Sequence, residues 1–264
     1  MGCKIIFSDI DGTLLNHEHH IGRRTREKIL ELDKQGIPFI LVSARMPDGV
    51  RLVQRELGNR RPIICYSGGL VLDEEGRALD SCQMELELAV KVRQFVRKRY
   101  PHICCNTYGG SRWVVEDNQN PQVIREERIT ESKSVAGDMQ DIFAEAGGIH
   151  KILLMGEVEE IARAEKELRE AFLQLSILRS NENYLEIMDG EVKKSRGVHC
   201  ICSYYGISEK DAAAFGDGEN DVDMLQAVNY SYAMANASAY VKERAGAVTL
   251  SNDDEGIYAV IREW

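Results

Sequence analysis

The chain has 264 residues, enough for one or two domains with a sizeable core. Its 44% apolar and 29% charged residues are ordinary globular usage, which excludes a wholly disordered, collagen-like or coiled-coil chain. Asp and Glu total 43 against 33 Lys and Arg, and the net charge of −10 repels the phosphate backbone of a duplex, so we expect no nucleic-acid partner.

We expect neither a targeting signal nor a membrane segment in this sequence. Aspartates at positions 9 and 11 precede any apolar core of a signal peptide, and no apolar run approaches the roughly 20 residues of a membrane span. The seven cysteines are an odd number without paired spacing, which predicts reduced, mostly buried thiols rather than a zinc site. The expected location is the cytoplasm.

Strand-like and helix-like segments alternate in the first 82 residues. Each strand candidate is a short β-prone apolar run, and each helix candidate has apolar residues at helical spacing. This alternation predicts a parallel sheet, followed by a hairpin that glycines punctuate. The predicted elements are a strand at 4–8, a helix at 25–34, a strand at 38–42, a helix at 50–57, a strand at 62–66 and the hairpin at 70–80.

The character of the sequence changes at about residue 83, where longer helices and short strands follow without regular alternation. The predicted elements are a helix at 86–100, strands at 103–107 and 111–116, a polar stretch at 116–133, a strand at 150–155, an amphipathic helix at 158–172 and a strand at 175–178. These elements predict an inserted α+β domain at 83–182.

The regular alternation resumes after the segment 183–188. The predicted elements are helices at 195–205, 221–227, 238–244 and 255–262, and strands at 212–215, 230–234 and 247–250. We therefore predict an α/β core of residues 1–82 and 183–264 that shares one central parallel sheet.

Asp9 and Asp11 follow directly on the first predicted strand, with Gly12 easing the turn. Ligands of open parallel sheets bind at this end of the strands. Buried unpaired carboxylates are expensive, so the two aspartates must share a metal or a proton nearby. The alternative is a solvated Asp–Gly turn, which is common after strands. A calcium loop fits poorly, because Gly12 is fourth rather than sixth from Asp9.

A second acidic turn, from Gly216 to Asp221, follows a small apolar strand and opens a helix. Asp221 alone would be an ordinary acid at a helix N-terminus. The glycines match neither the dinucleotide nor the Walker pattern, which disfavours a dinucleotide oxidoreductase. Two acidic turns at one sheet edge would form a cluster suited to Mg²⁺, which prefers oxygen ligands.

The pattern Asp9-x-Asp11-Gly12-Thr13, together with the acidic turn at 216–221, resembles the haloacid dehalogenase-like hydrolase superfamily. The nearest branch resembles the Cof-like sugar phosphatases, which carry a large α+β cap of type IIB between the second and third motifs. The insert predicted at 83–182 falls in that place. The resemblance covers nearly the whole chain and implies a Rossmann-like core with an inserted cap domain.

The resemblance also implies the roles of the acidic residues. Asp9 would be the nucleophile that forms an aspartyl-phosphate, and Asp11 the general acid and base. Asp9, Asp11 and Asp217 would hold Mg²⁺, which offsets the repulsion between a phosphate dianion and the attacking carboxylate. Asp221 would order the waters of the metal.

Three further residues would contact the phosphate by the same resemblance. Ser43 ends the second strand, although a serine there can also cap the next turn. Lys194 is the expected phosphate-binding lysine, with Lys193 as a real alternative. Asn220 resembles the phosphate-contacting amide of the family. Arg45 could contact a phosphate or leaving group, but a surface ion pair is the expected role.

Together these features predict a Mg²⁺-dependent phosphatase that hydrolyses small phosphorylated metabolites, in particular sugar phosphates, through an aspartyl-phosphate. A phosphomutase or phosphotransferase shares that intermediate, and a non-catalytic binding regulator could retain the phosphate site. The regulator would predict a broken first motif, whereas Asp9 and Asp11 are both present. We expect no membrane partner and a monomer or small homo-oligomer.

Overall fold

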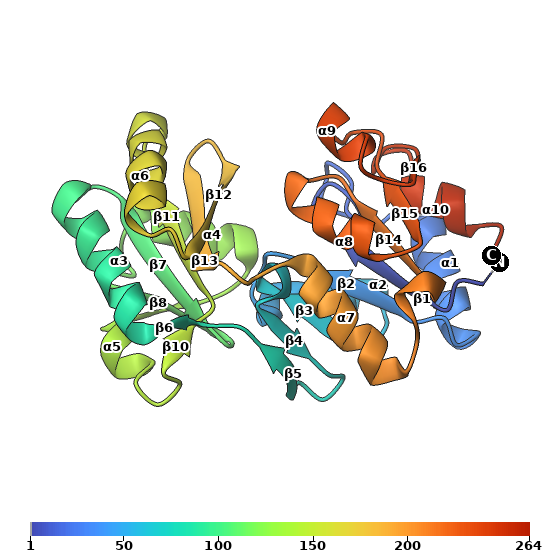
Figure 1. The fold of residues 1–264 in the computed structure, drawn as a ribbon, viewed down its shortest axis with the longest axis horizontal. Helices are drawn as coiled ribbons and strands as arrows, with labels where there is room; N and C mark the ends of the chain where they lie inside the picture. Colours follow the sequence, from blue (N-terminus) through green and yellow to red (C-terminus); the bar gives the residue numbers. More distant parts are fainter. Residues whose placement is uncertain (1) are drawn as a thin grey trace. The chain divides into compact units, whose positions relative to one another are not determined.

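The computed structural model describes residues 2–264, which form two compact units (Figure 1). The first unit consists of residues 2–81 and 193–264, and the second of residues 82–192. The chain therefore leaves the first unit once and returns to it once.

The first unit is built on an eight-stranded sheet of the order β16-β15-β14-β1-β2-β3-β4-β5. The strands from β16 to β3 are parallel, and β4 and β5 are antiparallel. Their bounds are β1 (Ile5–Asp9), β2 (Phe39–Val42), β3 (Ile63–Cys65), β4 (Leu70–Leu72), β5 (Ala78–Ser81), β14 (Ala212–Gly216), β15 (Tyr230–Ala233) and β16 (Ala247–Val248).

Strands β1, β2 and β14 are short apolar runs whose residues are all buried, as expected for a parallel sheet covered on both faces. β1 lies between β14 and β2, with Ile5 opposite Ala212 and Ile6 opposite Phe39. Because the three strands run in the same direction, their C-terminal ends lie at one edge of the sheet.

Helices cover both faces of this sheet. Apolar residues of α7 and α8 pack on the face that carries Ile5, Phe7 and Ile40, and these two helices lie in front of the sheet in Figure 1. The helices and 3₁₀ turns of this unit are α1 (Arg23–Lys34), α2 (Pro47–Leu57), η1 (Tyr66–Gly68), α7 (Lys194–Tyr205), η2 (Glu209–Asp211), η3 (Glu219–Asp221), α8 (Val222–Ala227), α9 (Ala239–Lys242) and α10 (Gly256–Ile261).

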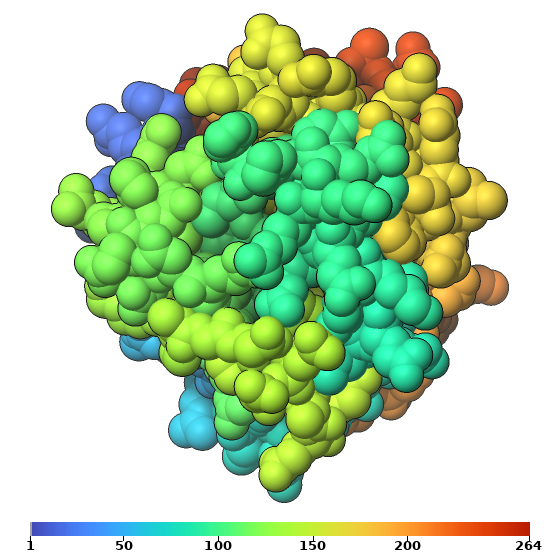
Figure 2. All heavy atoms as spheres, turned by 90° about the vertical axis from the view of Figure 1, so that its left-hand side faces the viewer, coloured from blue at the N-terminus to red at the C-terminus, as the bar shows by residue number. Residues whose placement is uncertain are grey.

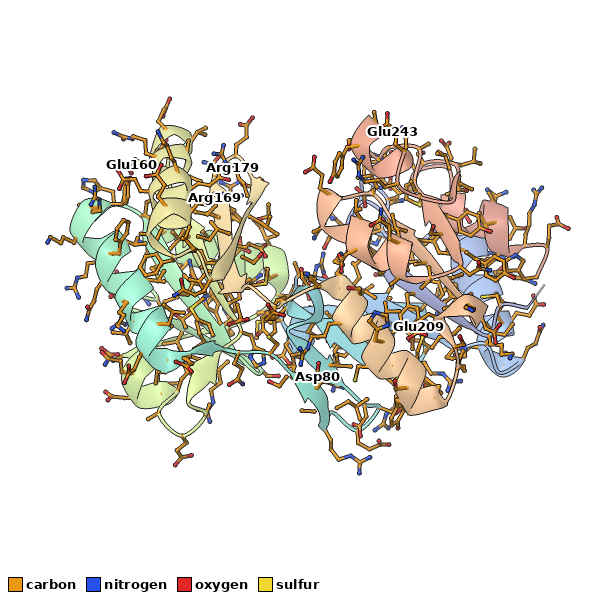
Figure 3. The ribbon with its side chains drawn as sticks, viewed as in Figure 1. Asp80, Glu160, Arg169, Arg179, Glu209 and Glu243 are labelled. Atoms are coloured by element: carbon orange, nitrogen blue, oxygen red, sulfur yellow. The ribbon has the colours of Figure 1, made fainter. Side chains whose placement is uncertain are left out.

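The hairpin β4–β5 is tied to α7 by a charged pair. Asp80, which is labelled in Figure 3, accepts hydrogen bonds of 2.6 and 2.9 Å from the guanidinium of Arg196. This bidentate pair joins the last strand before the second unit to the first turn of the helix that follows that unit.

The second unit contains a six-stranded sheet of the order β12-β13-β11-β7-β8-β9 and a two-stranded sheet of β10 and β6. The strand bounds are β6 (Met84–Glu85), β7 (Cys104–Gly109), β8 (Arg112–Val115), β9 (Ser134–Ala136), β10 (Gly148–Ile149), β11 (Lys151–Met155), β12 (Leu175–Asn181) and β13 (Tyr184–Asp189). The helices are α3 (Leu86–Arg99), α4 (Pro121–Thr130), α5 (Met139–Ile142) and α6 (Val158–Ala171).

The second unit has a hydrophobic core of its own. Val92 and Val96 of α3 and Ile161 of α6 pack there with Ile152 and Ile187 of the sheet. Figure 2 shows the surface that this unit presents on the left of Figure 1, with α3 in teal. The core explains why α3 and α6 carry apolar residues at helical spacing.

The structure differs from the sequence-based expectation at two places. Residues 183–188 were expected to return to the core, but β13 pairs with β11 and β12 in the sheet of the second unit. Its alternating pattern, with Leu185 and Ile187 in the apolar core, completes that sheet.

The polar stretch at 116–133 contains a helix, α4. The side chain of Asn120 accepts a hydrogen bond from the backbone of Gln122 at 2.9 Å, and Pro121 occupies the first turn. An Asn–Pro pair is a strong start signal for a helix, and this local signal outweighs the polar composition.

The predicted α/β class, with a central parallel sheet and an α+β insert, is confirmed. Among residues 2–264, no helix has the length and apolar character needed to cross a membrane.

Candidate active site

The ends of the three central strands bring together side chains that are far apart in the sequence. Asp9 is the last residue of β1, Ser43 follows β2, and Asp217 follows β14. Asp9 and Ser43 are buried, and Asp217 is partly buried. This is the edge at which parallel α/β sheets bind their ligands.

Lys194 is the first residue of α7, and its side chain is only 1% exposed. Its Nζ donates hydrogen bonds of 2.5 Å to Asp9 Oδ1 and to Asp221 Oδ1. Lys193 precedes the helix and is exposed. Of the two candidate lysines, the structure therefore brings Lys194 to Asp9, the residue predicted to be the nucleophile.

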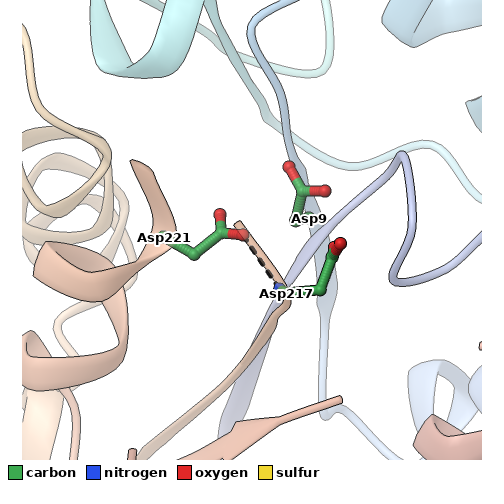
Figure 4. A group of neighbouring side chains, drawn as sticks. All are labelled: Asp9, Asp217 and Asp221. Atoms are coloured by element: carbon green, nitrogen blue, oxygen red, sulfur yellow. Dashed lines mark hydrogen bonds between the residues drawn. The ribbon is translucent and has the colours of Figure 1, made fainter. Parts of the chain in front are cut away.

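Asp221 holds the acidic turn in shape. Its Oδ2 accepts hydrogen bonds from the backbone N–H groups of Asp217 (3.0 Å) and Gly218 (2.8 Å), the first of which is the dashed line in Figure 4. Both of its carboxylate oxygens thus have partners inside the protein, the other being Lys194. Asp221 orders the turn and the lysine together.

Asp9, Asp217 and Asp221 form one acidic cluster, in which one oxygen of each lies within 4.8 Å of the others (Figure 4). In the described part of the chain, the ammonium of Lys194 is hydrogen-bonded to two of these three carboxylates, so the cluster has an excess of negative charge. Charges at such a depth need compensation, and a set of carboxylate oxygens suits a hard divalent cation. The residues present therefore fit a metal of this type.

The turn after β1 is shaped around Asp217. Gly12 has φ +79°, and a Cβ at this position would lie 2.4 Å from Asp217 Oδ2. The hydroxyl of Thr13 donates to Asp217 Oδ1 at 2.6 Å. Asn236 Nδ2 donates to the Gly12 carbonyl at 2.8 Å. The sequence-based prediction did not include Thr13 or Asn236 in the site, although Thr13 belongs to the motif that carried the family resemblance.

Burial or neighbouring charges raise the pKa values of Asp9, Asp217 and Lys194. Burial raises the pKa of Asp9 well above its ordinary value, against the opposing charge of Lys194. Burial also raises the pKa of Asp217 to about 6, while the hydrogen bond from Thr13 opposes this rise. Burial disfavours the ammonium of Lys194, but the charges of Asp221 and Asp9 outweigh it and raise the pKa of Lys194 above its ordinary value.

Asp11 is not part of this cluster of three carboxylates. Its oxygens instead accept hydrogen bonds from Arg45, 2.9 Å from Nε to Oδ2 and 2.5 Å from Nη2 to Oδ1. Arg45, for which a surface ion pair was expected, pairs with the predicted general acid and base.

The two remaining predicted phosphate contacts lie in different surroundings. Ser43 is buried, and its Oγ accepts a hydrogen bond from the backbone N–H of Arg45 at 3.1 Å. Asn220 is exposed in η3, and its side-chain oxygen lies against Gly218. Ser43 thus also makes the turn-capping contact that the sequence left open.

Comparison with known proteins places this site in a family. The family model described as haloacid dehalogenase-like hydrolase matches residues 6–261. The chain belongs to the haloacid dehalogenase-like hydrolase family. This match spans the strand end at Asp9, the whole insert and the acidic turn at 216–221, and it confirms the resemblance seen in the sequence.

Relatives of this hydrolase match over nearly their whole length. It is 34% identical over 260 residues to a Haemophilus influenzae protein provisionally named a phosphatase, covering 98% of this chain and 97% of the relative. It is 25% identical over 275 residues to a Bacillus subtilis protein named 5-amino-6-(5-phospho-D-ribitylamino)uracil phosphatase, covering 96% and 95%.

Solved structures agree with the fold. A haloacid dehalogenase-like hydrolase from Bacteroides thetaiotaomicron has a TM-score of 0.86 at 26% identity, covering 99% of each chain. A Thermotoga maritima protein has a TM-score of 0.88 at 24% identity, covering 99% of this chain and 97% of its own. Core and insert are therefore present together in these proteins.

Proposed function

We propose that this hydrolase is a Mg²⁺-dependent phosphatase that cleaves small phosphorylated metabolites through an aspartyl-phosphate on Asp9. The observation that carries the proposal is the position of Asp9, a buried carboxylate at the end of β1 that is hydrogen-bonded to Lys194 and lies within the acidic cluster. Such a carboxylate is held in one orientation, as covalent catalysis requires.

In the first half-reaction an oxygen of Asp9 attacks phosphorus, and the bond from phosphorus to the leaving oxygen breaks. Asp11 donates a proton to that oxygen. Ser43 can donate its hydroxyl hydrogen, and Lys194 supplies positive charge next to the attacking carboxylate. Asn220 is the proposed amide contact to the phosphate.

The proposed metal ligands are Asp9, Asp11 and Asp217, at the ends of β1 and β14. Asp221 would order the waters of the metal, and its own oxygens accept hydrogen bonds from Lys194 and from the backbone of Asp217 and Gly218. Mg²⁺ fits a set of carboxylate oxygens and, when bound, offsets the repulsion between a phosphate dianion and Asp9. The three carboxylates against one lysine support this assignment.

The substrate class is proposed to be small phosphorylated metabolites, with sugar phosphates foremost. Relatives over nearly the full length are named phosphatases, and one of them is named for a phosphorylated ribityl compound. The net charge of −10 argues against a polyanionic macromolecule as substrate. We further propose that the inserted unit is the cap domain of the type IIB branch and that the protein acts in the cytoplasm.

The test is phosphate release from a panel of sugar phosphates, nucleotides, flavin mononucleotide and pyridoxal phosphate, each with Mg²⁺ or with EDTA. Asp9→Asn should lose about a thousandfold or more of the activity, because the nucleophile is removed. Asp211→Asn is a matched control, since Asp211 pairs with Lys4 before the start of β14. Release that persists in EDTA, or in Asp9→Asn, would contradict the proposal.

A further inference from the structure

The first turn of α7 carries the ammonium that contacts the predicted nucleophile. Lys194 is the first residue of the helix, and its Nζ donates hydrogen bonds of 2.5 Å to Asp9 and to Asp221. A lysine side chain is a flexible four-carbon stem, so the backbone from which it starts must be held if the charge is to stay in one place. The position of the start of α7 therefore decides where the ammonium lies.

The start of α7 is capped by a residue of α8. The N-cap residue of α7 is Lys193, whose side chain carries donors and cannot accept a hydrogen bond. Asp223, in the first turn of α8, supplies the acceptor: its Oδ2 accepts a hydrogen bond of 2.7 Å from the backbone N–H of Ser195. A neighbouring helix thus satisfies one of the N–H groups that a helix start leaves open, and it does so with a negative charge at the positive end of the helix dipole.

Asp223 belongs to the same short segment as a partner of Lys194. It follows Asp221, which accepts a hydrogen bond from the lysine, by two residues. Apolar residues of α7 and α8 pack in one buried core, and the two helices lie side by side on the same face of the sheet (Figure 1). The hydrogen bond to Ser195 therefore fixes the start of α7 relative to the segment that receives its first side chain.

A tight turn contacts the residue before the helix. Gly68, at the end of η1, has φ +98°, and a Cβ there would overlap the carbonyl oxygen of Lys193 and lie 2.8 Å from its carbonyl carbon. Tyr66 and Ser67 of the same turn are also left-handed, with φ of 50° and 53°. Strained backbone of this kind persists where its surroundings hold it in place, and here the N–H of Ser67 donates to the carbonyl of Ser43 at 2.9 Å. The turn thus joins the end of β2 to the start of α7.

Two independent contacts therefore act on the residues that flank Lys194. Gly68 lies against the residue before it, and Asp223 binds the residue after it. A charge that stabilises a transition state must be held within about 0.5 Å of its productive position. Loss of either contact would move the ammonium relative to Asp9.

We propose that Asp223 is a positioning residue for Lys194, which fixes the first turn of α7 together with the close approach of Gly68. The inference rests on the proposed function, in which the ammonium stabilises charge during phosphoryl transfer. It differs from a purely structural helix cap, whose loss would lower stability but leave the turnover of the folded enzyme unchanged.

The test is steady-state kinetics of the full chain with p-nitrophenyl phosphate at saturating Mg²⁺, with rates expressed per folded protein. Asp223→Ala removes the acceptor and should lower kcat and kcat/KM equally, by about tenfold to a hundredfold, because the misplaced charge stabilises the transition state less. Asp223→Asn keeps an acceptor oxygen without the charge, so its kcat should stay within about threefold of the wild type.

Control variants separate the start of α7 from general effects. Asp73 accepts a hydrogen bond of 2.8 Å from the backbone N–H of Arg77 in the β4–β5 hairpin, so Asp73→Ala loses a comparable contact and should keep the wild-type kcat. Gly68→Ala should lower kcat. Gly206 lies at the other end of α7 with φ +65°, and nothing among the described residues lies within 4 Å of a Cβ there, so Gly206→Ala should not lower kcat.

A double-mutant cycle in the substrate-free protein tests the same link. Asp223→Ala should lower the urea midpoint more in the wild-type background than in Lys194→Met, because part of the loss comes from the displaced ammonium. The shift of Asp223→Asn should be equal in the two backgrounds, because the hydrogen bond at the start of α7 is kept.

A kcat of Asp223→Ala equal to that of the wild type or of Asp73→Ala would overturn the inference. Equal losses of kcat in Asp223→Asn and Asp223→Ala would also overturn it, since the charge rather than the hydrogen bond would then be responsible, and so would additive midpoint shifts in the cycle. A wild type that releases no phosphate would contradict the proposed function instead, and the cycle would still test the link to Lys194. Melting temperatures identify variants that do not fold, and the two Asp223 variants decide if Gly68→Ala is one of them.

Discussion

Lys194 is the residue on which the acidic cluster depends most. Its ammonium is buried and is hydrogen-bonded to Asp9 and to Asp221. A buried charge group of this kind is not a large net source of stability, but removal of one partner leaves the others uncompensated. The resulting loss of stability can be measured in the protein without any substrate.

Lys194→Met should lower the free energy of unfolding by about 3–5 kcal/mol in EDTA, because the three carboxylates of the cluster then share the site without a cation. Lys193→Met is the matched control, since the neighbouring lysine is exposed and should change stability by about 0.5 kcal/mol or less. Urea denaturation checks both. Equal stability of the two variants would show that Lys194 is not the compensating charge.

Asp217 should make cation binding sensitive to pH. Its pKa is raised to about 6, so below that pH it binds a proton, and the protonated acid is a poor ligand. The Mg²⁺ concentration that gives half of the thermal stabilisation should therefore rise by about tenfold per unit as the pH falls below 6. Thr13→Val removes a hydrogen bond that favours the carboxylate and should move this onset to higher pH. Identical half-saturation at pH 7 and pH 5 would count against Asp217 as a ligand.

The sequence indicated which residue types gather at the site but could not choose between adjacent residues. Lys193 and Lys194 differ only in which one enters the helix, and the start of α7 decides this. The pairing of Arg45 with Asp11 joins residues 34 positions apart and depends on the register of β1 and β2. Tertiary geometry of this kind is not encoded in local spacing.

At the scale of elements, the backbone conformation of the turn after β1 determines how closely Gly12 approaches the carboxylate of Asp217. Gly12 is in the left-handed region with no room for a Cβ, whereas Gly36, after α1, is in the same region with nothing within 4 Å. Substitutions at the two glycines therefore distinguish the effect of backbone strain from the effect of contact with Asp217.

Gly12→Ala and Gly36→Ala should each lower stability by about 1–2 kcal/mol, because a Cβ is unfavourable at positive φ. Only Gly12→Ala should also weaken stabilisation by Mg²⁺, because its Cβ would displace the carboxylate of Asp217. Thermal melts with and without Mg²⁺ check this. An equal loss of the Mg²⁺ response in both variants would refute the role of the turn.

In the second unit, His150 should make stability depend on pH. It is 1% exposed, and burial lowers its pKa from 6.5 to about 4. Between these pH values the unfolded chain binds a proton that the folded chain does not, so stability should fall as pH falls, by about 1.4 kcal/mol per unit. Above pH 6.5 both states are neutral and the effect disappears.

The measurement for His150 is denaturant unfolding at pH 7 and pH 4.5 for the wild type, His150→Gln and the control His102→Gln, in which an exposed histidine is replaced. Only His150→Gln should flatten the slope. The prediction fails if the three proteins lose stability equally.

The elements of the parallel core could be predicted from the sequence, because strands buried on both faces are continuous apolar runs that alternate with helical segments. The end of the insert could not be predicted, because β13 has the composition of a core strand and only its pairing with β11 assigns it to the second sheet. α4 was missed because polar residues dominate it, although Asn120 and Pro121 mark its start.

At the scale of the whole molecule, the two units have separate hydrophobic cores. A ligand that binds one folded unit stabilises that unit by mass action, by about 2.7 kcal/mol at a hundredfold excess over its dissociation constant. The proposed metal ligands all belong to the first unit.

Mg²⁺ should therefore slow hydrogen exchange in β1, β14 and the start of α7 and leave the core amides of β11 and β13 unchanged. Mass spectrometry of peptides from the exchanged protein compares the exchange rates in a Mg²⁺ buffer with those in EDTA. Equal slowing in both units would show that they unfold as one cooperative body.

The most direct test of the central claim is to locate the phosphoryl group. Asp11→Asn, mixed with p-nitrophenyl phosphate and Mg²⁺ and quenched in acid, should accumulate one phosphoryl group on the peptide that contains Asp9, because the group that accepts the proton of water is gone. The double variant with Asp9→Asn should carry none. Phosphate release by the wild type with no phosphorylated peptide in Asp11→Asn, or with the group on another residue, would contradict covalent catalysis by Asp9.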